Sequence, residues 1–167
     1  MVTRASTTRE EVLRILGEVK DPEVPVVSVV ELGIVREVAV EGERVTVTVT
    51  PTYSGCPAMR EIEDDIRAAL GANGISDVAI DTVYTPAWTT DWIGADAREK
   101  LRRFGIAPPG RAEPGGLIAL VRRHSPVPCP YCGSRNTALR SEFGSTACKA
   151  IHFCNACEQP FDEFKAF

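Results

Sequence analysis

Two pairs of closely spaced cysteines constrain the fold of this chain more than any other feature of its sequence. Cys129 and Cys132 form the first C-x2-C pair, and Cys154 and Cys157 form the second after an interval of 21 residues. Each pair turns the backbone so that both thiolates reach one ion, and two pairs complete a tetrahedral four-sulfur site. The spacing predicts a zinc ribbon whose intervening residues form a β-hairpin. Iron bound as in rubredoxin and a labile pair of redox dithiols remain alternatives.

The module that carries these cysteines, residues 125–167, is short, so bound metal is expected to supply much of its folding free energy. The N-terminal sequence MVTRASTTREE has no apolar run typical of a secretory signal. No apolar stretch approaches the roughly 18 residues that a membrane span needs. We therefore expect a cytoplasmic protein with no membrane partner. In that reducing compartment, closely spaced cysteines indicate metal binding before disulfides.

Composition and charge limit the classes of partner. The chain has 167 residues, of which 44% are hydrophobic and 25% charged, and its formal net charge is −4. This composition is that of a globular protein with a packed core. An acidic chain without basic clusters lacks the positive surface that binds nucleic-acid phosphates. Nucleic acid is therefore not an expected partner, although a nucleic-acid-binding zinc ribbon stays an alternative.

The residues before the cysteine-rich module alternate between helical and β patterns. We expect a helix after Thr7 and Thr8, a hairpin from residues 34–40 and 44–50, a helix over 57–70, a strand over 77–84 and a helix near 95–104. The predicted fold class is α+β: a small α/β sandwich, with helices on one face of a short mixed sheet, followed by a C-terminal zinc ribbon. The expected domains are residues 6–105 and 125–167, joined by a Gly/Pro-rich linker and a short strand over 106–124.

Cys56 stands far from the other five cysteines, at the predicted start of the second helix. If Pro57 is the first helical residue, Cys56 is the N-cap, and the helix dipole should lower its pKa. Thiolate is the form that binds soft metals or attacks electrophiles. The alternative is a small side chain with no chemistry.

Familiar thiol-enzyme patterns do not fit Cys56. A thioredoxin-like pair needs a cysteine at position 59, which is Met59, and a tyrosine-phosphatase loop needs an arginine at position 62, which is Ile62. A cysteine protease needs a partner histidine, and both histidines, His124 and His152, lie beyond the first domain. We therefore predict no catalytic residues, and transient binding of iron or a cluster is the favoured functional hypothesis.

Three further residues have competing interpretations. Asp21 and Glu23 could supply carboxylates near Cys56, but Asp21 could instead cap its own turn. Cys148, six residues before Cys154, is either a fifth thiol near the metal site or a small buried side chain.

Several segments resemble a known family. DPEVP after the first helix, ELGIV before the hairpin and TPTYSGCP before the second helix are similar to the small α/β domain of metal–sulfur cluster assembly factors. This domain occurs in bacterial SufT-like proteins and in the cytosolic iron–sulfur targeting proteins of eukaryotes. The match covers about residues 6–85.

The remaining segments resemble the family of phenylacetate-degradation proteins called PaaD or PaaJ. They are YTPAWTTDWI, FGIAPPG, CPYC and FGSTACKAIHFCNACEQPFDEFK, so the resemblance spans nearly the whole chain. Members of this family accompany the multicomponent oxygenase that epoxidises the ring of phenylacetyl-CoA. That oxygenase has a di-iron catalytic subunit and a reductase that carries flavin and a 2Fe–2S cluster.

The resemblance implies an accessory or maturation subunit of the phenylacetyl-CoA epoxidase, with no activity of its own, that helps to assemble iron or iron–sulfur centres. It implies Cys56 as the functional thiol, Asp21 and Glu23 as its neighbours, and a role for Cys148 within FGSTACKA. The cofactors would be structural zinc and transient iron or a cluster; the partners would be the oxygenase and reductase subunits, and a homodimer is compatible with the family. A general iron–sulfur assembly factor and a thiol enzyme are the alternative functions.

Overall fold

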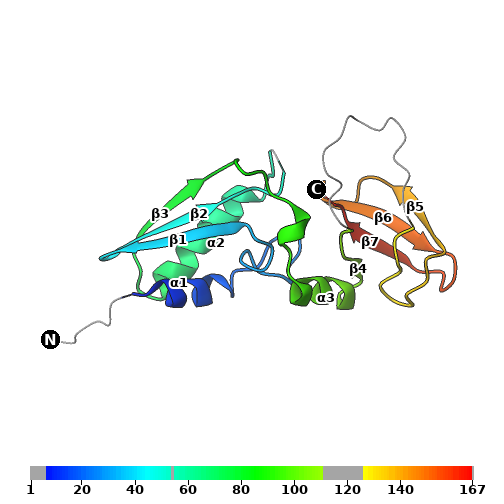
Figure 1. Cartoon of the computed structure of the whole chain (residues 1–167), viewed down its shortest axis with the longest axis horizontal. Coiled ribbons are helices and arrows are strands. Elements are labelled where there is room, and N and C mark those ends of the chain that lie inside the picture. Colours follow the sequence, from blue (N-terminus) through cyan, green and yellow to red (C-terminus); the bar gives the residue numbers. More distant parts are fainter. Residues whose placement is uncertain (1–6, 54, 111–125, 167) are drawn as a thin grey trace. The chain divides into compact units, whose positions relative to one another are not determined.

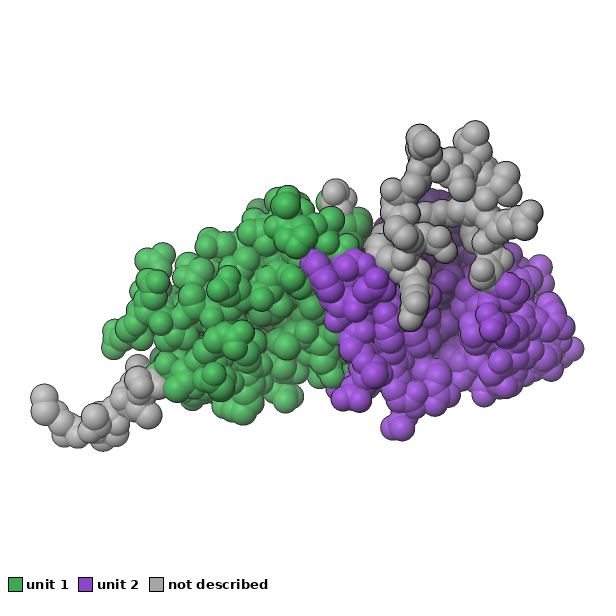
Figure 2. Space-filling model, in the orientation of Figure 1, with its two compact units in different colours: residues 1–88 green, residues 89–167 purple. Residues whose placement is uncertain are grey.

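The computed structural model describes residues 7–53, 55–110 and 126–166. The chain forms two compact units, residues 1–88 and residues 89–167, which Figure 2 shows in different colours. The contacts therefore place the helix near residue 100 in the same unit as the cysteine-rich module. A folding boundary near residue 105 remains a proposal about which segments fold independently. The strand expected within residues 106–124 falls on 117–121, outside the described residues.

The first unit is built on a three-stranded mixed sheet. Strand β1 (Val35–Glu41) pairs antiparallel with β2 (Arg44–Val49), and β2 pairs parallel with β3 (Asp77–Thr82). The strand order is β1-β2-β3, so β2 is central. The alternation that predicted β2 is reflected in its burial, because its three valines are buried and the threonines between them are half-buried. The predicted hairpin and mixed sheet are confirmed.

Two helices supply the apolar residues that cover this sheet. Helix α1 (Arg9–Leu16) begins after Thr8, whose hydroxyl accepts the backbone N–H of Glu11 as the capping pattern predicted. Helix α2 (Met59–Ala72) forms the crossover between the parallel strands β2 and β3, and it contacts both α1 and β3 (Figure 1). The core-facing side chains of α2 are fully buried at Ile62, Ile66 and Leu70. The turn between β2 and α2, which contains Cys56, is therefore held by elements on either side.

The second unit contains a four-stranded sheet. Its strands are β4 (Ile106–Ala107), β5 (Thr137–Ser141), β6 (Lys149–Cys154) and β7 (Pro160–Phe164), in the order β4-β7-β6-β5 (Figure 1). The β5–β6 pair is the hairpin predicted between the cysteine pairs. Strand β7 adds to it antiparallel, and β4 pairs parallel with β7.

A single arginine fastens the start of this unit. Helix α3 (Ala95–Arg103) follows the short 3-10 helix η1 (Thr90–Trp92). From α3, Arg98 donates to three backbone oxygens: those of Ile93 at 3.0 Å, Thr90 at 2.7 Å and Pro109 at 2.6 Å. Because these acceptors precede and follow the helix, one guanidinium group holds the whole 90–109 segment together.

None of the helices in the described part of the chain has the length and apolar character that crossing a bilayer requires.

Candidate metal sites

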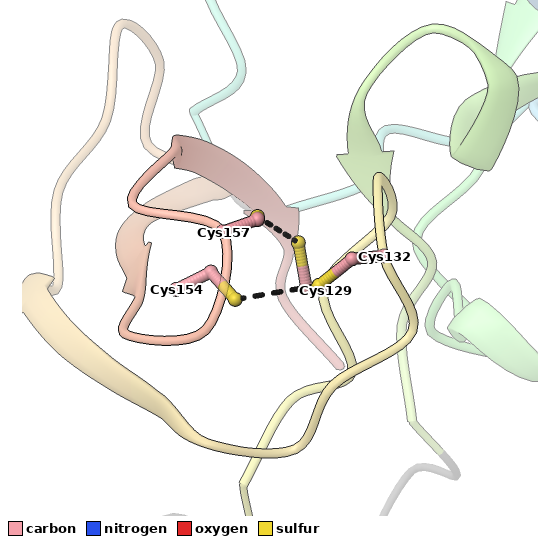
Figure 3. Close-up of side chains that lie close together, drawn as sticks. All are labelled: Cys129, Cys132, Cys154 and Cys157. Carbon is pink, nitrogen blue, oxygen red and sulfur yellow. Dashed lines mark hydrogen bonds between the residues drawn. The ribbon is translucent and has the colours of Figure 1, made fainter.

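The four predicted ligand cysteines converge in the second unit. Their sulfur atoms all lie within 4.8 Å of one another, and Figure 3 shows the four side chains pointing toward a common centre. Cys129 Sγ lies 3.7 Å from Cys157 Sγ, and Cys132 Sγ lies 3.6 Å from Cys154 Sγ. A tetrahedron with zinc–sulfur bonds of about 2.3 Å has sulfurs about 3.8 Å apart. The spacing therefore matches a four-thiolate zinc site.

Both cysteine pairs use the same backbone turn. The N–H of Gly133 donates to the oxygen of Cys129, and the N–H of Glu158 donates to the oxygen of Cys154, each at 2.9 Å. The residue after the second cysteine has a positive φ in both turns, 74° at Gly133 and 58° at Glu158. Glu158 is the only non-glycine residue in the described segments with a positive φ. The two turns are thus equivalent in geometry although their sequences differ.

The surroundings of the sulfurs suit thiolate ligands. Cys129 and Cys154 are buried in a cluster with Ala107 and Phe161, against which Cys157 also packs. The backbone N–H groups of Cys157 and Ala156 donate to the sulfur of Cys154 and lower its pKa to about 7. A donor set of four sulfurs without oxygen ligands is typical of structural zinc, which would fix the two turns and the β6 strand end together.

Two nearby residues occupy positions that differ in their relation to this site. Cys148 is buried, and its sulfur lies 3.0 Å from the Thr146 hydroxyl; it is not among the four converging sulfurs. His152 is also buried, whereas its apolar neighbours in the sequence predict a surface residue. Its ring stacks on Phe161 and its Nε2 lies 2.7 Å from Oε2 of Glu163. His152 shares a strand face with Cys154, and that face packs toward the metal site.

The second candidate site is the turn around Cys56, where one prediction was wrong. Helix α2 begins at Met59 with Ala58 as its N-cap, so Cys56 is not the capping residue. Cys56 instead lies between two turns: its N–H donates to the oxygen of Tyr53 at 3.2 Å, and its own oxygen accepts the N–H of Met59 at 3.4 Å. Gly55 precedes it with a φ of 85°, a conformation that other residues rarely adopt.

The pKa of Cys56 is raised, not lowered as expected from a helix N-cap. Burial is the largest cause, because the half-buried thiol loses solvation that its thiolate form needs. A hydrogen bond from the backbone of Ala58 opposes this effect, and the negative charge of Glu23 adds to it. A hydrogen bond with the Thr52 side chain lowers the pKa, and Asp21 raises it further. The thiol is therefore mainly protonated at neutral pH.

These electrostatic effects show that Asp21 and Glu23, remote from Cys56 in sequence, lie within range of its sulfur. Asp21 also has the structural role considered from the sequence. Its Oδ1 accepts the backbone N–H groups of Glu23 and Val24, each at 2.8 Å, so it caps its own turn. The same carboxylate thus holds the loop in place and adds negative charge beside the thiol.

The partner hydroxyl of the sulfur could not be chosen from the sequence. TPTYSGCP offers several hydroxyl side chains before Cys56, and nothing in the spacing distinguishes Thr52 from the others. Thr50, two residues earlier, is buried, and its hydroxyl has no hydrogen-bond partner among the described residues. The turn that carries Cys56 therefore begins with two buried threonines.

Comparisons with known proteins divide the chain in the same way as its chemistry. Residues 9–82 match the family model of an iron–sulfur cluster assembly protein. Residues 114–165 match that of the PaaD zinc beta ribbon domain. The first match includes Asp21, Glu23 and Cys56, and the second includes the four converging cysteines.

Relatives and solved structures extend this result. A protein of Escherichia coli (strain K12), named for the fourth component (D) of a 1,2-phenylacetyl-CoA epoxidase, is 44% identical over 99% of this chain and 97% of its own. A protein of Porphyromonas gingivalis named an Fe-S protein maturation auxiliary factor is 38% identical over 56% of this chain and 90% of its own. The crystal structure of a DUF59 domain of unknown function from Bacillus anthracis is 29% identical, with a TM-score of 0.52 over 55% of this chain and 89% of that one. By its similarity to the E. coli protein along almost the whole chain, and by the two family models, this chain belongs to the PaaD family of phenylacetyl-CoA epoxidase components.

Proposed function

We propose that this protein is an accessory subunit of a phenylacetyl-CoA epoxidase system and that it helps to assemble the iron or iron–sulfur centres of that system. The observation that carries the proposal is the arrangement at Cys56: a half-buried sulfur with the carboxylates of Asp21 and Glu23 in electrostatic range. The name of the E. coli relative and the maturation-factor names of the shorter relatives support the same function.

The chemistry of the turn suits an ion that is held briefly and passed on. A raised pKa keeps the Cys56 thiol protonated until a cation arrives, and the cation then displaces the proton because only the thiolate is a ligand. Soft sulfur together with hard carboxylate oxygens accommodates iron. A small and incomplete donor set binds iron weakly, which allows its transfer to a client. The protein performs no reaction on an organic substrate in this scheme.

The two units have different roles in the proposal. The first unit presents Cys56 to iron or to a cluster, and the zinc ribbon is a structural or docking element. The clients would be the oxygenase and reductase subunits of the epoxidase in the cytoplasm, because these carry the metal centres that need assembly. A homodimer is compatible with this role, and Cys148, buried beside Thr146, is left without an assigned step.

Coexpression tests the proposal. The oxygenase and reductase subunits are produced with the wild-type protein or with its Cys56→Ser variant, purified without oxygen, and analysed for iron content and epoxidase activity. We expect the variant to retain its fold and zinc but to yield oxygenase or reductase deficient in iron. Cys148→Ala is the matched thiol control and should support full loading. A fully loaded, active epoxidase obtained with Cys56→Ser would contradict the proposal.

The carboxylates provide a second test. Asp21→Asn keeps an oxygen that can cap the turn, and Glu23→Gln preserves side-chain size, so neither change should disturb the loop. If the carboxylates share the ion, the double variant should bind less ferrous iron than the wild-type protein under anaerobic dialysis. Unchanged iron binding would restrict the site to the sulfur.

A further inference from the structure

The four sulfurs of the ribbon differ sharply in their access to solvent. Cys129 and Cys154 are buried, with exposed fractions of 2% and 0%. Cys157 is half-buried and packs against the same apolar cluster. Cys132 is exposed and does not belong to that cluster. A tetrahedral site that is closed on the side of three ligands is therefore open on the side of the fourth.

A surface cavity lies on this open side. It has a volume of about 390 Å³ and is lined by Cys132 and its turn, by three prolines, Pro108, Pro128 and Pro130, and by Arg102. It belongs wholly to the second unit. The cavity gives small molecules an approach to Cys132, whereas Phe161 and Ala107 cover the sulfurs of the buried cysteines.

We propose that Cys132 is an oxidation site of the ribbon, at which a hydroperoxide triggers the loss of zinc. This goes beyond the assembly function of the first unit and does not depend on Cys56. Oxidation of cysteine follows thiolate character and exposure. As zinc ligands all four sulfurs are thiolates, so their different exposure decides which one reacts first. Cys132 is the exposed one.

The second sulfur needed for a disulfide is already adjacent. Cys154 Sγ lies 3.6 Å from Cys132 Sγ. Attack of the Cys132 thiolate on the peroxide breaks the O–O bond, forms a sulfenic acid and releases hydroxide or, from an organic peroxide, alkoxide. The Cys154 thiolate then attacks the sulfenic sulfur and displaces a second hydroxide. Two thiolates are oxidised, one peroxide is reduced, and the site retains two thiolates, too few to hold the ion.

The first experiment uses the zinc-loaded full-length protein and hydrogen peroxide. Zinc release is followed with a chromogenic chelator, and oxidised residues are mapped by fragmentation mass spectrometry. We expect zinc release to parallel a Cys132–Cys154 cross-link. With substoichiometric iodoacetamide, Cys132 should be labelled on the order of tenfold faster than Cys129. Equal labelling of the four sulfurs, a first reaction at Cys157, or oxidation confined to Cys56 with zinc retained would overturn the proposal.

Two matched variants separate exposure from ligand loss. Histidine nitrogen also binds zinc tetrahedrally, and it does not form a disulfide. Cys132→His should keep zinc and release it several-fold more slowly in peroxide, whereas Cys129→His, which leaves Cys132 in place, should stay sensitive. Equal sensitivity of the two variants would overturn the proposal. Where a variant fails to bind zinc, the labelling pattern of the unmodified protein decides.

Discussion

The indole N–H of Trp88 donates to the backbone oxygen of Leu32 at 2.9 Å, and both residues are buried. This bond joins the segment after β3 to the segment before β1, which are 56 positions apart. Of the two roles open to a tryptophan here, packing and docking, burial of Trp88 favours packing. Trp92, four residues on, is half-buried. The bond leads to the first prediction.

Replacing Trp88 should destabilise the first unit in two steps. Trp88→Phe keeps most of the apolar area but leaves the buried oxygen of Leu32 without its donor, which should cost about 1–3 kcal/mol. Trp88→Ala adds the loss of the ring and should cost about 3–5 kcal/mol. Urea unfolding followed by circular dichroism measures both. Tyr84→Ser, at a side chain that is 66% exposed, is the control and should change stability by less than about 0.5 kcal/mol. Equal effects at positions 84 and 88 would contradict the packing role.

Removing one ribbon ligand should unfold the cysteine-rich module selectively. In Cys129→Ser, loss of zinc removes the free energy that holds β5, β6 and β7, and β4 should follow because it pairs with β7. Hydrogen exchange measured by mass spectrometry should show fast exchange beyond residue 125 and in residues 106–107, with protection retained in β1, β2 and α2. A strong chelator added to the wild-type protein should have the same effect. A protected, metal-free ribbon would refute this prediction.

The two equivalent turns should respond to substitution in opposite directions. Gly133→Ala introduces a Cβ at a φ of 74°, where no atom lies within 4 Å, so only the backbone is strained. It should destabilise the zinc-loaded protein by about 1–2 kcal/mol. Glu158→Gly removes the same strain at a φ of 58° and should stabilise it by up to about 1 kcal/mol, since the entropy of glycine offsets part of the gain. Guanidinium unfolding at a fixed free zinc concentration tests both; a loss of stability in Glu158→Gly would show that its side chain has a role.

The reactivity of Cys56 should depend on pH in a defined direction. Because burial and the carboxylates of Glu23 and Asp21 raise its pKa, its thiolate fraction at neutral pH is smaller than that of an ordinary cysteine. Alkylation at Cys56, read by mass spectrometry, should therefore rise with pH through a midpoint above that of a free thiol. Metal affinity at this site should rise over the same range, because binding displaces the proton.

Glu23→Gln removes one of the negative charges and should shift that midpoint to lower pH, so that alkylation near neutral pH becomes faster. Glu18→Gln, at an exposed position on the same unit, is the matched control and should leave the midpoint unchanged. A midpoint at or below the ordinary value in the wild-type protein would contradict the electrostatic description of the turn.

Patterns that depend on one element, or on one ion, are readable in the sequence. The alternation of Val45, Val47 and Val49 specifies a strand with one buried face, and Thr8 specifies the start of α1. The two cysteine pairs specify the ribbon, because ligand spacing is set by the metal and not by the rest of the fold.

Features that depend on a neighbouring element are not readable in this way. Pro57 is compatible with the first turn of a helix, but the chain makes a separate turn from Cys56 to Met59 before α2 begins, which changes the environment of the thiol. The PFDEF segment of β7 lacks alternation and becomes a strand because β6 offers it a partner. The apolar neighbours of His152 favour a surface position for the ring. In the ribbon, however, the face that carries Cys154 is the buried one, so the ligand decides which side of β6 is inside.

The pairing of β4 with β7 has a consequence for biosynthesis. Ile106 pairs with Asp162, so the ribbon sheet is complete only after the last strand has left the ribosome. The sheet and helices of the first unit, by contrast, lie within residues 9–82 and can fold earlier, since domains generally fold in order during synthesis. The nascent chain therefore displays a finished Cys56 turn while the ribbon still lacks its second cysteine pair. Zinc capture is the final step of maturation, and the concentration of free zinc in the cell at that moment sets how much of the newly made protein becomes fully folded.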